Sequence, residues 1–227
     1  MAKFYGVHMG HIVGSVIDTE YDELRDYVQT VEDALRGKFK TFQERAEARA
    51  EGMSPEAKER YFEDLAEDAI FLWDRFPSLT WKTAFTTAYS IYEHHLLNLC
   101  GHAGRYGGFD IHVDDIKGTG IFAAQIYLKK VCKVAFPDSC QDWQDVLQMN
   151  KIRNIFVHRL GRMKRDGTWK GLPEYQKRKA KLIEFTEGGE IRFLEGYCLD
   201  AIEVFRRHFK TTLASVPDEL LRRSKDE

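Results

Sequence analysis

Residues 146–161 read VLQMNKIRNIFVHRLG, and this stretch decides the fold that we expect for the chain. On a helical wheel one of its sides is mostly polar and the other is apolar. The polar side carries Asn150, Arg153, Asn154, Val157 and His158. The apolar side carries Met149, Ile152, Ile155 and Phe156. We therefore predict a helix over residues 141–160, with Gly161 in the left-handed position just beyond its end.

The upstream part of this helix is expected to be covered on both faces. Trp143, Val146 and Leu147 continue the polar side as an apolar stripe. Arginine, asparagine and histidine side chains would then lie in a partly buried seam. Burial without partners costs about 1–3 kcal/mol for each polar group, so a bound phosphate or a partner subunit is expected to compensate.

Apolar residues spaced three and four apart recur along most of the chain. They predict further helices over residues 20–50, 54–76, 79–99, 121–136 and 197–213. The breaks between them are expected at Gly52, Pro77, Gly101 and Pro137, since glycine and proline interrupt helices. Residues 162–182 are expected to form a long loop with room for one helical turn.

A small β-hairpin is expected before the last helix. Residues 183–186 and 191–193 alternate between apolar and polar side chains, and a Gly-Gly pair lies in the turn between them. The predicted fold is thus all-α, an up-and-down helical bundle with one hairpin. We expect an N-terminal arm over residues 1–18, a single helical domain over 19–215 and a charged tail over 216–227.

The composition limits the classes of function. The 227 residues carry 34 Lys and Arg against 36 Asp and Glu, so the net charge of -2 predicts no general attraction to polyanions. We found no apolar run long enough for a membrane span and no signal-peptide pattern, so a cytoplasmic protein without membrane contact is expected. The cysteines are scattered without a Cys-x-x-Cys pair and are expected to be reduced thiols. They are Cys100, Cys132, Cys140 and Cys198.

Arg153 and His158 are the residues whose chemistry suits phosphodiester cleavage. Arginine offers a permanent planar fork for phosphate oxygens, and histidine can both take and give a proton near neutral pH. Asn154 lies four residues before His158, so its amide is expected either to orient the imidazole or to hold the scissile phosphate. The alternative is a solvated arginine and a core histidine with satisfied hydrogen bonds, because this spacing is common by chance.

Two further polar residues are expected to support the same site. Asn150 lies on the polar side of the predicted helix, and Glu93 is a carboxylate on an otherwise apolar helix. A carboxylate in such a place needs a partner, for which Arg153 or His158 is suitable. His94, His95 and His102 show no zinc-protease spacing, so we expect core or surface histidines, no metal site and no cofactor.

The segment after the motif concentrates positive charge. Between Arg159 and Lys181 nine basic residues stand against two acidic ones, a local net charge of +7. The RNA-binding candidates are Arg159, Arg162, Lys164, Arg165, Lys170, Lys177, Arg178 and Lys179. Trp169 and Tyr175 are expected to stack on unpaired bases. The alternative is an ordinary solvated lysine-rich loop.

Residues 146–161 closely resemble the signature helix of HEPN domains (higher eukaryotes and prokaryotes nucleotide-binding), in which an apolar helix carries Arg, a polar residue and then His. Residues 87–100 resemble the upstream helix of large HEPN proteins, and the whole resemblance covers about residues 20–215. It implies a bundle of four or five helices and a homodimer whose two signature helices face each other across a composite cleft. It also implies endoribonuclease activity in toxin or phage-defence settings.

One position departs from a regulated subgroup of that family. In HEPN toxins silenced by a partner nucleotidyltransferase, a tyrosine two residues after the histidine receives the adenylyl group. Leu160 occupies that position here, so control by that modification is not expected. An antitoxin of another kind remains a possible partner.

These observations predict a metal-independent endoribonuclease. His158 is expected to act as general base or acid, Arg153 to stabilise the charged phosphorane and Asn154 to orient, while the ribose 2′-hydroxyl attacks the phosphate. A first alternative is a non-catalytic module that binds RNA or nucleotides. A second is a helical protein recognised by an antitoxin, which is favoured if the motif side of the helix packs against the domain's own core.

Overall fold

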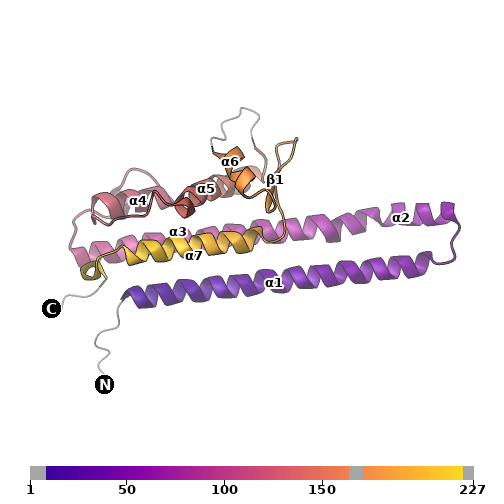
Figure 1. Cartoon of the computed structure of the whole chain (residues 1–227), viewed down its shortest axis with the longest axis horizontal. Helices are drawn as coiled ribbons and strands as arrows, with labels where there is room; N and C mark the ends of the chain where they lie inside the picture. Colours follow the sequence, from indigo (N-terminus) through magenta and orange to yellow (C-terminus); the bar gives the residue numbers. More distant parts are fainter. Residues whose placement is uncertain (1–8, 164–170, 222–227) are drawn as a thin grey trace, which may run out of the picture.

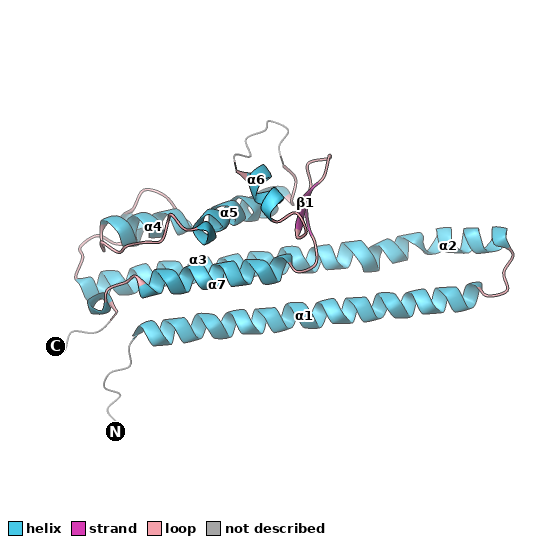
Figure 2. Ribbon diagram, in the orientation of Figure 1, coloured by secondary structure: helices cyan, strands magenta, loops and turns pink. Residues whose placement is uncertain are grey.

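The computed structural model describes residues 9–163 and 171–221, and helices dominate both ranges (Figure 1). The long helices are α1 (Met9–Ala50), α2 (Pro55–Ile70), α3 (Phe76–Gly107), α4 (Gly120–Lys130), α5 (Gln141–Arg159) and α7 (Tyr197–Ala214). The short elements are the π-helix η1 (Phe71–Arg75), the 3₁₀ helices η2 (Val113–Asp115) and η3 (Asp218–Leu220), and α6 (Leu172–Arg178). Strands β1 (Ile183–Phe185) and β2 (Ile191–Phe193) pair antiparallel (Figure 2). The predicted all-α bundle with a β-hairpin before the last long helix is confirmed.

Helices α3 and α7 form the centre of the bundle (Figure 1). Helix α1 lies along one side of this pair, and α4 and α5 lie along the other. Helix α2 and the second half of α1 extend beyond the end of α7 as a long helical hairpin. None of the residues of α2 is buried, so this projecting part contributes little to the core.

The first helix begins ten residues before the predicted domain boundary. Residues 9–18 belong to α1, so the prediction of an arm there is wrong, and residues 1–8 lie outside the described part. Ile17 and Tyr21 are fully buried, and the Tyr21 hydroxyl donates to the carbonyl of Ala88 at 3.2 Å. Burial of Ile17 in the core accompanies helix formation in a segment whose mixed local sequence did not indicate it.

Pro77 and Gly101 do not end helices, contrary to the prediction. Before Pro77 the chain widens into the π-helix η1, where the amide of Phe76 donates to the carbonyl of Phe71. Pro77 then occupies the first turn of α3, where a missing amide is tolerated. Gly101 lies inside α3 because its neighbours Cys100 and Ala103 are buried in the core, and tertiary packing outweighs glycine's low helix propensity.

Two other predicted boundaries are also corrected. The helix expected over residues 121–136 ends at Lys130, and the non-helical segment after it places Val134 and Phe136 in the core. The tail expected from residue 216 is folded as far as residue 221, with Val216 and Leu221 buried. Residues 222–227 lie outside the described part. No helix among the described residues is both long and apolar enough to cross a membrane.

Candidate active site on helix α5

Helix α5 buries the face that its sequence predicts. Its amino end is capped by Cys140, whose sulfur accepts from the amide of Trp143 at 3.4 Å. Trp143 and Val146 are buried, so this first half is covered on both sides, as expected. Further along, the apolar side is buried in the core and the polar side is not. The buried residues there are Met149, Ile152, Ile155 and Phe156.

The last turn of α5 is open to solvent. Val157 is 51% exposed and Leu160 is 85% exposed, and His158 lies between them, also exposed. The chain then joins the hairpin, where the amide of Ile191 donates to the carbonyl of Gly161 at 3.0 Å. The predicted left-handed conformation of Gly161 is present, with φ of 87°. The motif side of α5 therefore does not pack against the domain's own core at this end.

Arg153 is held by polar groups from two helices. Its Nη2 lies 3.1 Å from Glu93 Oε2 on α3, and its Nη1 donates to Asn154 Oδ1 at 2.9 Å. Its guanidinium carbon lies 4.9 Å from the centre of the Tyr89 ring, a cation–π geometry. The predicted pairing of Glu93 with Arg153 is therefore present in the structure. The Arg153 side chain remains 24% exposed, and its Nε is buried with no hydrogen-bond partner among the described residues.

Four polar side chains complete a network around this arginine. Asn154 Nδ2 donates to Asn150 Oδ1 at 3.3 Å, and Asn150 Nδ2 donates to the Tyr89 hydroxyl. That hydroxyl donates in turn to Glu93 Oε1 at 3.3 Å. Burial raises the pKa of Tyr89 far above its ordinary value, so the hydroxyl stays protonated and can donate while it accepts. Glu93 thus contacts Arg153 directly, and Asn150 is linked to it through Asn154.

Tyr89 and Gly120 belong to this site but were not identified from the sequence. Tyr89 lies four residues before Glu93 on α3, a helical spacing that could have indicated their contact. Gly120 is the first residue of α4 and has a φ of +57°. Glu93 Oε1 lies against it, in the space that a Cβ at residue 120 would fill. No sequence signal links residues 93 and 120.

The predicted contact between Asn154 and His158 is not formed. Both ends of the Asn154 amide are engaged with Arg153 and Asn150 instead. A hydrogen bond from a charged donor is about twice as strong as a neutral one, which explains why Asn154 turns toward the arginine. Within the described ranges, no side chain orients the His158 imidazole.

Two of the predicted RNA-binding residues serve the fold. Arg178 lies 2.5 Å from Oδ1 of Asp145, a buried carboxylate on α5. Lys179 lies 2.6 Å from Asp200 Oδ2 and 3.7 Å from Asp145 Oδ2. These ion pairs fasten α6 to α5 and α7, and the RNA-binding role of both residues stays a prediction.

The remaining candidates of the basic segment fall into two groups. Arg159, Arg162 and Lys177 are exposed and available to a polyanion. The residues that lie outside the described part are Lys164, Arg165, Trp169 and Lys170.

Tyr175 is fully buried, and its hydroxyl lies 3.1 Å from that of Tyr197. The prediction that Tyr175 stacks on bases is therefore wrong.

Two of the three histidines set aside from the sequence have other hydrogen-bond partners. His95 is buried with its Nε2 2.7 Å from Glu20 Oε2, and His94 hydrogen-bonds Asn98 at 2.9 Å. Among the described residues no three His, Cys, Asp or Glu side chains group so as to hold a metal ion. The buried cysteines are Cys100, Cys132 and Cys198.

The arrangement joins a fixed, partly exposed guanidinium to a solvent-open imidazole on one helix. Such a pair can hold a phosphate and move protons beside it.

Comparisons of the chain with protein-family models, with curated proteins and with solved structures found no match.

Proposed function

We propose that the chain is a HEPN-type endoribonuclease that works as a homodimer, in a toxin or defence setting, and cleaves RNA without a metal ion. One observation carries the proposal. Arg153 is fixed by Glu93 and Asn154 yet partly exposed, and His158 is exposed five residues further along the same helix. The alternative was a solvated arginine and a core histidine, and an exposed His158 does not fit a core histidine.

The proposed reaction needs only these side chains and the RNA. His158 accepts the proton of a ribose 2′-hydroxyl, whose oxygen attacks the adjacent phosphorus. Arg153 donates to the phosphorane oxygens, where negative charge develops. The bond from phosphorus to the 5′-oxygen breaks, and an imidazolium returns a proton to that oxygen. The products are a 2′,3′-cyclic phosphate and a 5′-hydroxyl end.

A second copy of the chain is proposed to cover the open end of α5. Val157 and Leu160 expose apolar surface on both sides of His158. The backbone of Leu160 has a φ of 52°. This left-handed conformation costs a residue with a Cβ about 1–2 kcal/mol. A twofold contact here would bring two His158 side chains together, so one could act as base and the other as acid.

The Glu93–Arg153 ion pair supports one alternative. It offsets the charge of Arg153 and would suit a module that binds RNA or nucleotides without cutting them. The other alternative is a helical protein recognised by an antitoxin. It would be favoured if the motif side of α5 packed against the core of the domain. Val157 and His158 are exposed, so that condition is not met.

The test is cleavage of a labelled RNA in EDTA by the parent protein and by His158→Ala. We expect 2′,3′-cyclic phosphate ends from the parent and a rate lower by a factor of about 100 to 10,000 in the variant. RNA binding should be kept, because the basic surface is unchanged. His112→Ala, at an exposed histidine before η2, is the matched control.

Two outcomes would overturn the proposal. If His158→Ala cuts RNA as fast as the parent, the histidine takes no part and the binding-module alternative replaces the enzyme. If cleavage stops with chelator and returns with magnesium, the metal-independent mechanism is wrong.

A further inference from the structure

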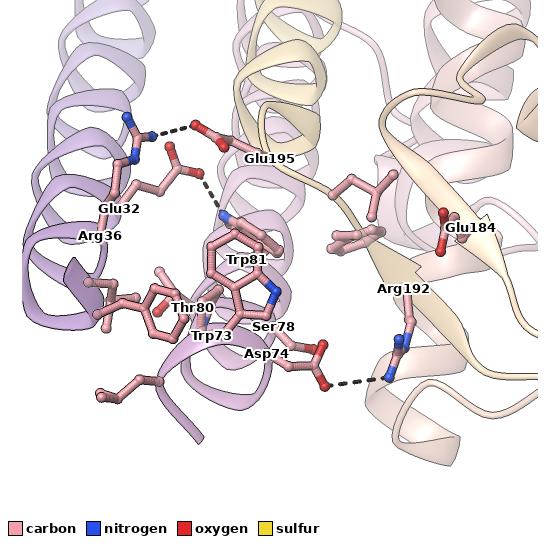
Figure 3. Close-up of a pocket in the computed structure, with 16 residues that line it drawn as sticks. Glu32, Arg36, Trp73, Asp74, Ser78, Thr80, Trp81, Glu184, Arg192 and Glu195 are labelled. Carbon is pink, nitrogen blue, oxygen red and sulfur yellow. Dashed lines mark hydrogen bonds and ion pairs between the residues drawn. The ribbon is translucent and has the colours of Figure 1, made fainter. Parts of the chain in front are cut away.

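A pocket of about 290 Å³ lies where the α1–α2 hairpin leaves the bundle (Figure 3). Its walls come from α1, from η1 and the start of α3, and from the β-hairpin. The aromatic side chains that line it are Phe39, Trp73, Trp81 and Phe193. The pocket therefore offers several aromatic faces, and its volume is near the lower end of the range for small-molecule sites.

The charged side chains of this pocket carry an excess of negative charge. Its acidic residues are Glu32, Asp74, Glu184 and Glu195, and its basic residues are Arg36 and Arg192. Figure 3 shows how both arginines are paired. Arg36 Nη2 lies 2.5 Å from Glu195 Oε1, and Arg192 Nη2 lies 3.4 Å from Asp74 Oδ2. Glu32 and Glu184 form no ion pair with these arginines, although the charge of Arg36 lowers the pKa of Glu32 and Arg192 is opposite Glu184 in the hairpin.

Glu32 is a half-buried carboxylate that contacts one of these aromatic rings. Its Oε1 accepts from Trp81 Nε1 at 2.6 Å, so a neutral indole is the partner of this charge (Figure 3). A half-buried carboxylate with a neutral partner is poorly compensated, and a bound cation would stabilise it. Burial also raises the pKa of Glu32, which agrees with that account.

We propose that this pocket binds a small organic cation with a flat apolar body, such as an aromatic amine or amidine. Aromatic faces attract cations through the ring quadrupole, and Trp73 and Trp81 supply the two largest faces. The charge of the ligand would lie toward Glu32, and Glu184 adds negative charge on the opposite side of the pocket (Figure 3). Anions are disfavoured, because Arg36 and Arg192 are already engaged and the remaining lining charge is negative.

This site is distinct from the one on α5 but adjoins it through a single aromatic contact. Phe193 lines the pocket, and its ring lies 4.9 Å from that of Phe156, which is between Arg153 and His158 in the chain. Binding here does not depend on whether the protein cleaves RNA. The experiment can therefore be read without any activity assay.

Three probes share one ring and differ in charge: benzamidine, benzamide and benzoate. Titration of the full-length protein would be followed by calorimetry and by the indole N–H signals of its tryptophans. We expect saturable binding of benzamidine with a dissociation constant in the high micromolar to millimolar range, as fits a ligand of this size. The Trp73 and Trp81 signals, assigned with Trp→Phe variants, should shift, and that of buried Trp143 should not.

Three variants test whether binding depends on the charge of the carboxylates or only on the shape of the cavity. Glu32→Gln keeps the hydrogen bond with Trp81 available and should weaken benzamidine binding about fivefold or more. Glu184→Gln, at an exposed position on β1, should weaken it as well and is a second test if Glu32→Gln folds poorly. Glu63→Gln, an exposed carboxylate on α2 away from the pocket, is the matched control and should bind as the parent does.

Three results would overturn the proposal. One is the absence of saturable benzamidine binding at 20 mM, roughly the weakest affinity consistent with this ligand size. Another is benzoate or benzamide binding as tightly as benzamidine, which would show that charge is not what the pocket selects. The third is unchanged affinity in both Glu32→Gln and Glu184→Gln when both variants are folded by circular dichroism.

Discussion

Arg153 Nη2 on α5 lies 3.1 Å from Glu93 Oε2 on α3, and both side chains are less than one quarter exposed, at 24% and 22%. This ion pair joins two residues that are sixty positions apart in the sequence. Partial shielding from water makes such a pair stronger than an ordinary surface salt bridge. Its main consequence for the proposed enzyme is that one terminal nitrogen of the guanidinium has a fixed position.

Glu93→Gln should lower cleavage without unfolding the protein. The amide keeps the shape and one acceptor for Arg153 but loses the charge that holds the guanidinium in place. We expect kcat to fall about tenfold, a loss of about 1.4 kcal/mol of transition-state stabilisation, with the melting temperature little changed. Single-turnover cleavage and thermal unfolding would be measured together. A variant with parental kcat would show that the ion pair does not position Arg153 for catalysis.

Gly120→Ala should break the same ion pair by displacing the Glu93 carboxylate. An added methyl group would occupy the space of Glu93 Oε1, and the flexible end of that glutamate is what must move. Residue 120 also has a positive φ, so strain of about 1 kcal/mol is expected in addition. We expect both lower stability and a loss of cleavage at least as large as that of Glu93→Gln.

Gly118→Ala is the matched control for that substitution. Residue 118 has a φ of +130°, but a Cβ there would meet only the amide nitrogen of Ala123 at 3.9 Å. This variant should lose stability through backbone strain and keep its cleavage rate once folded. Equal loss of activity in the two variants would attribute the effect to strain rather than to Glu93.

The basic segment should divide into residues that bind RNA and residues that hold the fold. Lys177 and Lys181 are exposed, so Lys177→Gln with Lys181→Gln should weaken RNA binding and reduce its salt dependence, with unfolding unchanged. Arg178→Gln removes a partner of buried Asp145 and should destabilise the protein by about 1–3 kcal/mol. Denaturant unfolding and filter binding over a range of salt would separate the two effects. A stable Arg178→Gln would contradict this division.

The local pattern of α5 could be read from its sequence because its helical period is strong. The buried and exposed sides followed from the spacing of Met149, Ile152, Ile155 and Phe156, and the Glu93–Arg153 contact followed from the cost of burying a lone carboxylate. Both inferences use short-range periodicity or a general energetic rule. The β-hairpin was predictable for the same reason, since its turn chemistry is local.

Other parts of the site depend on contacts between distant segments and could not be predicted. A cation that meets RNA and a cation that meets an aspartate look alike in a sequence, so the ion pairs of Arg178 and Lys179 could not be predicted. Tyr175 in a polar segment gave no sign that it would be buried against Tyr197. Gly101 looked like a helix end, but core packing on both sides keeps α3 helical there.

The stability of the protein should fall in mild acid because of His208. This side chain is fully buried on α7, with its Nδ1 2.7 Å from the Tyr92 hydroxyl, and burial lowers its pKa from 6.5 to about 4. Between these values the unfolded chain binds a proton that the folded chain does not, so stability is present above pH 6.5 and is lost as pH falls toward 4. The loss from this residue is at most about 3 kcal/mol.

His208→Gln would isolate this contribution. The glutamine cannot titrate, so the free energy of unfolding of the variant should depend less steeply on pH between 6.5 and 4. Denaturant unfolding at several pH values gives the two slopes. Identical slopes for parent and variant would assign the acid sensitivity to other groups.

Leu160→Asn should separate the proposed dimer from the folded monomer. The side chain of Leu160 is 85% exposed in a left-handed conformation that asparagine adopts more readily. The variant should therefore be at least as stable as the parent, yet lose apolar surface beside His158. We expect weaker self-association by sedimentation and a specific cleavage rate that rises with protein concentration more steeply than in the parent. Ile111→Asn, at a loop residue that is 48% exposed, is the control and should change neither. A parent protein that sediments as a monomer at low micromolar concentration, or a Leu160→Asn variant that dimerises as tightly as the parent, would remove this surface from the proposed active site.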